Sequence, residues 1–246
     1  MGEIFYSYLG NIMAEYKLNT QEYDDPDLIV AYHSEINGKF QKAIENYKIV
    51  LEKFPDSGTI YRHMGNIYYR LGNLSEAVPC LEKAVELLPD YASARYELGL
   101  AYYRQARLKD AFGCMESVLD LDPDYLMANY YAGIFYYHYG QLFRAKSHFT
   151  QLTQKNPEFI IAFFHLGVTN LRLGYYSEAI DNFNTLIRLN PDNASAFALL
   201  GDAYSNLNMV NEAKISYNKA LELDPDDNKA RRGLSGLVDH DDESKD

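Results

Sequence analysis

The chain has 246 residues, of which 47% are hydrophobic and 24% charged, a composition that supports a large buried core and excludes a wholly disordered protein. Its formal net charge of −12 opposes any binding mode that neutralises many phosphates, so nucleic acids and anionic membrane surfaces are poor candidate partners. The sequence has no apolar run of the roughly 20 residues that span a bilayer, no secretory signal pattern and only two cysteines, so it predicts a cytoplasmic protein with reduced thiols.

The first predicted element is an amphipathic helix over residues 3–18, within a segment that we assign to residues 1–23. Apolar residues recur there at helical spacing along one face, at Ile4, Phe5, Tyr8, Leu9, Ile12, Met13 and Tyr16. One interpretation is a cap on the elements that follow, and the other is a helix that docks into a groove or pairs with a second chain. The sequence leaves both interpretations open.

Residues 24–227 carry an internal repeat of 34 residues in six copies. Three columns share this period: Pro55, Pro89, Pro123, Pro157, Pro191 and Pro225; Ala43, Ala77, Ala111, Ala145, Ala179 and Ala213; and Gly65, Gly99, Gly133, Gly167 and Gly201. Each copy is predicted to form two helices, because a residue that tolerates positive φ follows the first and the proline ends the second. The mid-helix glycines predict a close approach of the first helix to the alanine of the second. In the third copy Ala106 stands at the turn between the two helices, so that turn is expected to be strained.

Two further elements follow the sixth copy. Residues 228–238 predict a final helix that covers the last repeat with one apolar face. Residues 239–246 form an acidic run that predicts a mobile, solvated tail.

The repeat columns resemble those of the tetratricopeptide repeat family, as in the stretches MGNIYY…LGNLSEAVPCLEKAVELLP and LGLAYYRQARLKDAFGCMESVLDLDP. The resemblance implies an all-α, right-handed solenoid of helix-turn-helix repeats whose first helices line a concave face that binds peptides or partner helices. It therefore implies a protein–protein interaction scaffold or adaptor that is not an enzyme and carries no cofactor or metal.

The resemblance also indicates which residues face the concave side. We expect a groove concentrated on the third to fifth copies, with apolar members Tyr69, Tyr96, Leu100, Tyr103, Tyr130, Ile134, Tyr137, Phe164, Val168 and Leu171 and basic members Arg62, Arg70, Arg104, His138 and Arg172. Such a surface favours a peptide segment or helix that offers apolar anchors and acidic residues. The alternative is that the Tyr69 and Arg70 columns reflect ordinary scaffold preference. Towards the last copy the expected lining becomes Ala198, Asp202, Ser205 and Asn206.

Other functions have less support in the sequence. It contains no Walker-type loop, no H-E-x-x-H and no G-x-S-x-G motif. Family members that clamp acidic chaperone tails use Lys, Asn and Arg at positions where this chain has Glu97, Met127 and Tyr131, so that binding mode is not expected. Two alternatives to an adaptor remain: a structural protein that self-associates through its N-terminal helix, and a regulatory subunit of an enzyme complex.

Overall fold

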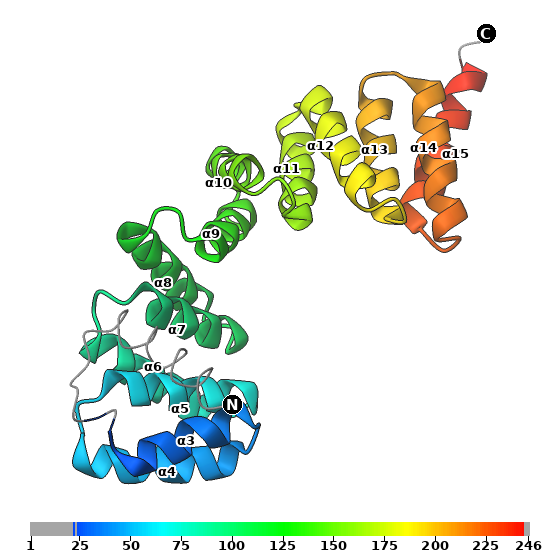
Figure 1. Ribbon diagram of the computed structural model, residues 1–246. Coiled ribbons are helices and arrows are strands. Elements are labelled where there is room, and N and C mark those ends of the chain that lie inside the picture. Colours follow the sequence, from blue (N-terminus) through cyan, green and yellow to red (C-terminus); the bar gives the residue numbers. More distant parts are fainter. Residues whose placement is uncertain (1–21, 23, 244–246) are drawn as a thin grey trace. The chain divides into compact units, whose positions relative to one another are not determined.

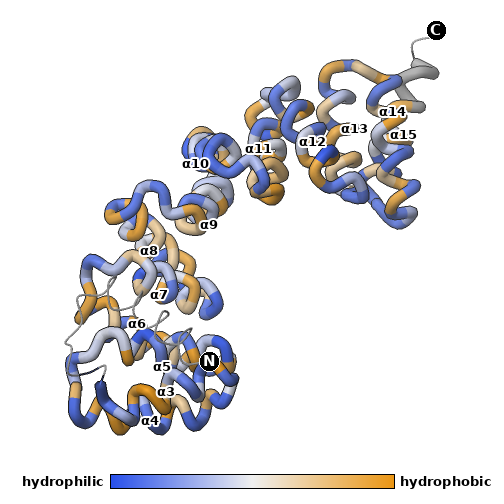
Figure 2. Tube along the Cα trace, viewed as in Figure 1, coloured by the Kyte–Doolittle hydropathy of each residue, from blue (hydrophilic) through white to orange (hydrophobic). Residues whose placement is uncertain are grey.

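The computed structural model describes residue 22 and residues 24–243, and within this part of the chain it contains thirteen α-helices and no strand (Figure 1). The chain divides into two compact units, with the boundary between Leu121 and Asp122. Each unit is a series of antiparallel helix pairs. Hydrophobic residues are interspersed with hydrophilic ones along the helices (Figure 2).

The helices follow the predicted repeat, two to each copy. The first unit contains α3 (Pro26–Ile36), α4 (Phe40–Lys53), α5 (Gly58–Arg70), α6 (Leu74–Leu87), α7 (Ala92–Arg104) and α8 (Leu108–Leu121). The second contains α9 (Leu126–His138), α10 (Leu142–Lys155), α11 (Ile160–Leu173), α12 (Tyr176–Leu189), α13 (Ala194–Asn206), α14 (Val210–Leu223) and α15 (Asn228–Glu243).

The two ends of the chain differ in how far the predictions can be followed. The predicted helix at residues 3–18 lies outside the described residues. At the other end α15 begins at Asn228 and continues to Glu243, so the predicted end at residue 238 is wrong and residues 239–243 of the predicted tail are helical. No glycine or proline follows Gly236, so the sequence offers no residue that would stop this helix earlier.

The turns between the paired helices have the backbone geometry that the sequence predicts. Gly38, Gly72, Gly140 and Gly174 have φ between 70° and 79°. Asn208 and Ala106 reach 57° and 58° at the equivalent positions, although both carry a Cβ. For alanine this left-handed conformation costs about 1 to 2 kcal/mol, so the turn at Ala106 is strained as expected.

The mid-helix glycines do allow close packing, but their partner is larger than predicted. A Cβ at Gly133 would lie 2.6 Å from Cε1 of Phe149, and a Cβ at Gly167 would lie 2.6 Å from Cε1 of Phe183. These rings, four residues after the column alanine, are fully buried against the glycine. The predicted contact with the column alanine is less close. At Gly65 an added Cβ would lie 3.3 Å from the carbonyl oxygen of Ala77, but only 2.6 Å from Cγ of Leu81.

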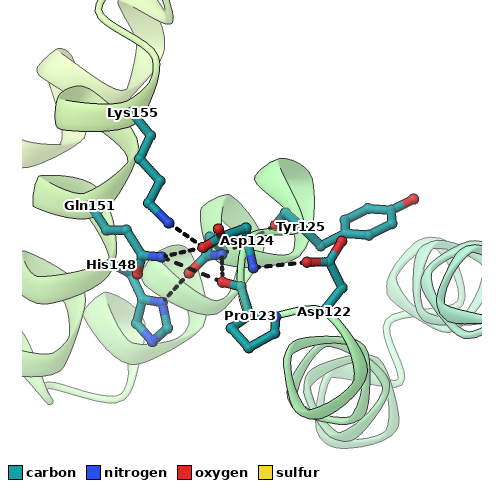
Figure 3. Close-up of polar contacts among 8 residues, drawn as sticks. Asp122, Pro123, Asp124, Tyr125, His148, Gln151 and Lys155 are labelled. Atoms are coloured by element: carbon teal, nitrogen blue, oxygen red, sulfur yellow. Dashed lines mark hydrogen bonds and ion pairs between the residues drawn. The ribbon is translucent and has the colours of Figure 1, made fainter.

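The loop before α9 is held against α10, which fixes the first helix of the second unit (Figure 3). Asn129 Nδ2 donates to the carbonyl oxygen of Pro123 at 2.8 Å, and His148 Nδ1 lies 2.9 Å from Asn129 Oδ1. Lys155 forms an ion pair with Asp124. The last turn of α10 and the first turn of α9 are therefore tied together at one end of the helix pair.

Candidate functional site

A groove of about 480 Å³ runs across the first helices of the second unit. Its walls come from four helices and are mostly apolar: Ile134, Tyr137 and His138 of α9; Phe164, His165 and Val168 of α11; Ser195, Ala198 and Leu199 of α13; and Asp227 and Lys229 at the start of α15. Most of these side chains are partly exposed, so the groove is open to solvent. It can therefore receive a ligand without rearrangement of the core.

The groove crosses the four helices diagonally. It starts at His138, the last residue of α9, and ends at Asp227, which directly precedes α15. Aligned on the 34-residue repeat, Phe164 corresponds to Tyr130, yet Phe164 lines the groove and Tyr130 does not. Each successive first helix thus contributes residues about one helical turn earlier than the helix before it.

His165 lies at the centre of the groove wall and is held by aromatic rings. Its ring stacks on the buried ring of Phe149, with centroids 5.4 Å apart and an interplanar angle of 19°. The hydroxyl of Tyr130 lies 3.2 Å from His165 Nε2, where it donates when that nitrogen is unprotonated. Burial, with a smaller contribution from the charge of His138, lowers the pKa of the His165 imidazole to about 4. His165 is therefore neutral in the folded protein at physiological pH.

This depressed pKa predicts that the second unit loses stability in mild acid. Between about pH 6.5 and pH 4 the unfolded chain binds a proton that folded His165 does not, so the free energy of unfolding falls as the pH falls through that range. We expect a loss on the order of 2 kcal/mol, allowing for the partial exposure of the ring. Urea unfolding of wild type and His165→Gln at several pH values measures it, because the other histidines cancel in the difference. A difference between the two proteins that stays constant from pH 7 to pH 4.5 would contradict the assignment.

The α15 end of the groove is closed by a network of polar contacts. Asp227 Oδ1 accepts from the backbone N–H groups of Lys229 and Ala230 at 2.8 and 2.9 Å, which caps α15. Lys229 Nζ forms an ion pair with Asp202 Oδ2 at 3.0 Å, and the hydroxyl of Tyr217 donates to Asp202 Oδ1 at 2.8 Å. The charges at this end are thus paired within the chain.

The opposite end carries a cation without a carboxylate partner among the described residues. The guanidinium of Arg172 lies over the ring of Tyr137, 4.6 Å from its centroid, and the structure gives it no hydrogen bond or ion pair. Arg104 lies over Tyr69 in the same way, at 4.7 Å, but also donates to the carbonyl oxygen of Tyr69 at 2.9 Å. Arg172 therefore keeps its N–H groups available, whereas Arg104 uses one of its N–H groups in a hydrogen bond to the backbone of Tyr69.

Arg62 and Arg70 make contacts within the first unit. Arg62 forms a two-point ion pair with Glu97, with distances of 2.5 Å (Nη2–Oε1) and 2.6 Å (Nε–Oε2), and both side chains are largely buried. Arg70 lies over the ring of Phe40 at 4.5 Å. The contact of Arg70 agrees with the alternative that its column serves the scaffold, and Arg62, which lies outside that column, is paired with Glu97.

The structure brings together only part of the predicted set. Five predicted residues line the groove (Ile134, Tyr137, His138, Phe164 and Val168), and Arg172 reaches it through Tyr137. Tyr130 does not line the groove, but its hydroxyl lies 3.2 Å from His165 Nε2, and Leu171 packs against the core of α12 and α13. Tyr69, Tyr96, Leu100 and Tyr103, with Arg62, Arg70 and Arg104, belong to the first unit.

The prediction missed His165, Ser195, Leu199, Asp227 and Lys229. The sequence analysis assigned residues from 228 onward to a cap alone. Of the lining expected in the last copy, only Ala198 is part of the groove. The groove is thus displaced towards the C-terminus, onto the fourth to sixth copies and α15.

Two other kinds of site find no support in the described part of the chain. Its residues include no group of three or more His, Cys, Asp or Glu that could hold a metal ion. Burial raises the pKa of the Cys80 and Cys114 thiols to about 11, which disfavours the reactive thiolate at both.

No helix among the described residues is long and apolar enough to cross a membrane.

Solved structures of other repeat proteins share this fold. YrrB, described as a TPR protein with an unusual peptide-binding site, is 23% identical with a TM-score of 0.73, covering 78% of this chain and all of that one. MamA from MSR-1 is 26% identical with a TM-score of 0.61, covering 68% of this chain and 97% of its own. MamA from Desulfovibrio magneticus RS-1 is 20% identical with a TM-score of 0.63, covering 70% and 97%.

Family models for the repeat match the sequence directly. A model described as TPR repeat matches residues 65–105 and 171–208. Three models described as tetratricopeptide repeat match residues 37–78, 93–125 and 194–227. A search of curated protein sequences gave no significant match. With more than half of its residues matched and its helices paired at the 34-residue period, the chain belongs to the tetratricopeptide repeat family and has an all-α solenoid fold.

Proposed function

We propose that the chain is a non-catalytic adaptor that binds an extended segment of a partner protein in the groove of its second unit. The observation that carries the proposal is the open, mostly apolar groove across α9, α11, α13 and α15. An apolar hollow with a few polar groups at its ends is typical of a recognition site. The groove offers no nucleophile activated by a base, so binding is the function that its residues support.

The dimensions of the groove favour an extended ligand over a helical one. Neighbouring helices pack ~8 to 10 Å apart, and the groove shifts by one turn, about 5.4 Å, at each helix. Three such steps give a path of about 30 Å, which an extended peptide covers with about nine residues. A helix that covers the same path needs about 20 residues at 1.5 Å each. Because it is about 10 Å across, it would present only one face to this open groove of about 480 Å³.

The charges of the groove favour a ligand with an acidic residue at the α9 end. Arg172 supplies a cation there that has no carboxylate partner among the described residues, and its guanidinium lies over the ring of Tyr137, which lines the groove. At the α15 end Lys229 is paired with Asp202. A ligand carboxylate at the Arg172 end therefore gains a charge-assisted hydrogen bond, while the apolar wall receives its anchors.

A random nonapeptide library displayed on phage and selected on the full chain tests the proposal. We expect enriched peptides to share apolar residues about three positions apart and an acidic residue near one end. Binding of an enriched peptide, synthesised and followed by fluorescence anisotropy, should weaken about tenfold in Arg172→Gln, because one charge-assisted hydrogen bond is lost.

The chain supplies matched controls for this experiment. Arg104→Gln removes the arginine of the same column in the first unit and should leave the affinity unchanged. Ser195→Arg places a large side chain in the groove at an exposed position and should abolish binding without loss of helical content. Absence of enrichment, or equal weakening by Arg172→Gln and Arg104→Gln, would refute the proposal.

A further inference from the structure

A second hollow of about 370 Å³ lies beside the groove in the second unit. The two share Phe164 of α11 and Ser195 of α13, which form the ridge between them. The remaining walls of this side pocket are Ile160, Ile161, Leu186, Asn190 and Asn193. The side pocket therefore adjoins the groove at the N-terminal ends of α11 and α13.

The chemistry of the side pocket differs from that of the groove. Four of its seven lining residues are aliphatic or aromatic, the other three are the uncharged polar residues Asn190, Asn193 and Ser195, and none carries a formal charge. Ile161 is 41% exposed, a large apolar side chain that the described residues leave open to solvent. Asn193 uses its Oδ1 to accept from the backbone N–H of Ala196 at 3.0 Å, so its amide NH₂ group remains as a donor at the rim.

We propose that the side pocket is a specificity site for one large apolar side chain, such as Phe, Leu or Met, of the segment that lies in the groove. This inference rests on the proposed function. Successive side chains of an extended segment point to opposite sides. A segment that passes over Phe164 and Ser195 therefore directs one side chain into the groove and its neighbour into the side pocket. The volume holds an aromatic ring, and the uncharged walls disfavour a charged residue there.

The first test compares nonapeptide libraries selected on wild type and on Ile161→Lys. Peptides selected on wild type should show a large apolar residue at one further position, in addition to the positions that supply the groove anchors. Ile161→Lys should lose the preference at that position and retain the groove anchors and the acidic residue. The control Ile215→Lys changes an isoleucine of α14 that is 69% exposed and lies outside both hollows, and should select the wild-type motif. Circular dichroism checks the fold, and Ile161→Ser serves as a milder variant.

A second measurement separates the side pocket from general weakening. In a synthetic peptide, changing the preferred residue to Ala should weaken binding to wild type about tenfold to a hundredfold. The same change should have little effect on binding to Ile161→Lys, where the pocket is already lost. An identical motif on both proteins, or equal losses in both, would overturn the side pocket while the groove stands. No enrichment on wild type would overturn both.

Discussion

Replacing Tyr217 by Ala lowers the free energy of unfolding of the second unit by an expected 3 to 5 kcal/mol, or about the cost of deleting a buried aromatic ring. The ring is 2% exposed and lies between two glycines of different helices. A Cβ at Gly201 of α13 would lie 2.6 Å from its Cδ1, and a Cβ at Gly233 of α15 would clash with its Cζ. Removing the ring leaves a cavity that two backbones border, and neither glycine has a side chain to fill it.

The same substitution should also release α15. Tyr217 donates to Asp202, the carboxylate that pairs with Lys229 of α15. Burial and this hydrogen bond raise the pKa of the Tyr217 phenol, so the group stays protonated and the bond stays intact in mild alkali. Without the ring, α15 loses its packing partner, and Asp202 loses the hydrogen bond that positions it for the ion pair with Lys229.

Hydrogen exchange followed by mass spectrometry measures the effect locally, since the two units need not unfold together. Peptides from α13 to α15 should lose protection in Tyr217→Ala, and peptides from α5 to α7 should not. Tyr217→Phe keeps the ring and removes only the hydroxyl, so it should cost about 1.5 to 3 kcal/mol. If Tyr217→Ala costs less than Tyr217→Phe, packing of the ring between the two glycines does not stabilise this end of the chain.

Gly133→Leu is the second change with a large expected effect, a destabilisation of about 3 kcal/mol, with about 2 kcal/mol for Gly133→Ala. The first added carbon would already lie 2.6 Å from Phe149, whose ring is fully buried and stacked on His165. The ring cannot move without disturbing the groove wall. We therefore expect the pKa of His165, followed by NMR, to rise towards its ordinary value in these variants as its surroundings loosen.

Gly113 is the matched control for this prediction. It also lies within a helix, but a Cβ at Gly113 would meet no atom within 4 Å. Gly113→Ala should therefore stabilise the chain by about 1 kcal/mol, the helix propensity difference alone. Urea unfolding of the two alanine variants should show opposite signs. The same sign for both would mean that propensity, not the contact with Phe149, decides the outcome at Gly133.

Most of the fold follows from local rules that a sequence displays. The 34-residue period gave the number of helix pairs, and the glycine, asparagine and alanine positions gave the turns with positive φ. These features depend on a few neighbouring residues, so they can be predicted one copy at a time. The partner of the mid-helix glycines was harder to predict. The column alanine is the obvious small neighbour, but the fit is set by the rotamer of the larger residue one turn later.

The candidate site was predicted less well, because it depends on how the copies are rotated relative to one another. Reasoning by columns assumes that a groove follows equivalent positions, so Tyr130 and Phe164 were assigned the same role. In the second unit the residues that line the groove instead lie about one turn earlier on each successive first helix. Phe164 therefore lines the groove, whereas Tyr130 only contacts the lining residue His165. The rotation of one copy relative to the next cannot be read from the residues of a single copy.

The basic column shows a second limit of pattern reading. The sequence placed Arg70, Arg104 and Arg172 in one column, and it left open whether they bind a ligand or serve the scaffold. The structure gives each an aromatic ring within the chain, and Arg104 a backbone carbonyl as well. Only the contacts of the individual side chains show that Arg104 donates to a backbone carbonyl, whereas Arg70 and Arg172 make no hydrogen bond or ion pair among the described residues.

The diagonal path also sets a limit on how long one binding site in such an array can be. Helix α9 has 13 residues, which is fewer than four turns. A groove whose lining residues lie one turn earlier on each successive first helix therefore runs from the C-terminal end of one first helix to the N-terminal end of the fourth, and it cannot continue further. Adding copies to the array would not lengthen the site. It would create further separate sites, and a longer relative built this way would gain strength through multivalency, by holding several short segments of a partner at once.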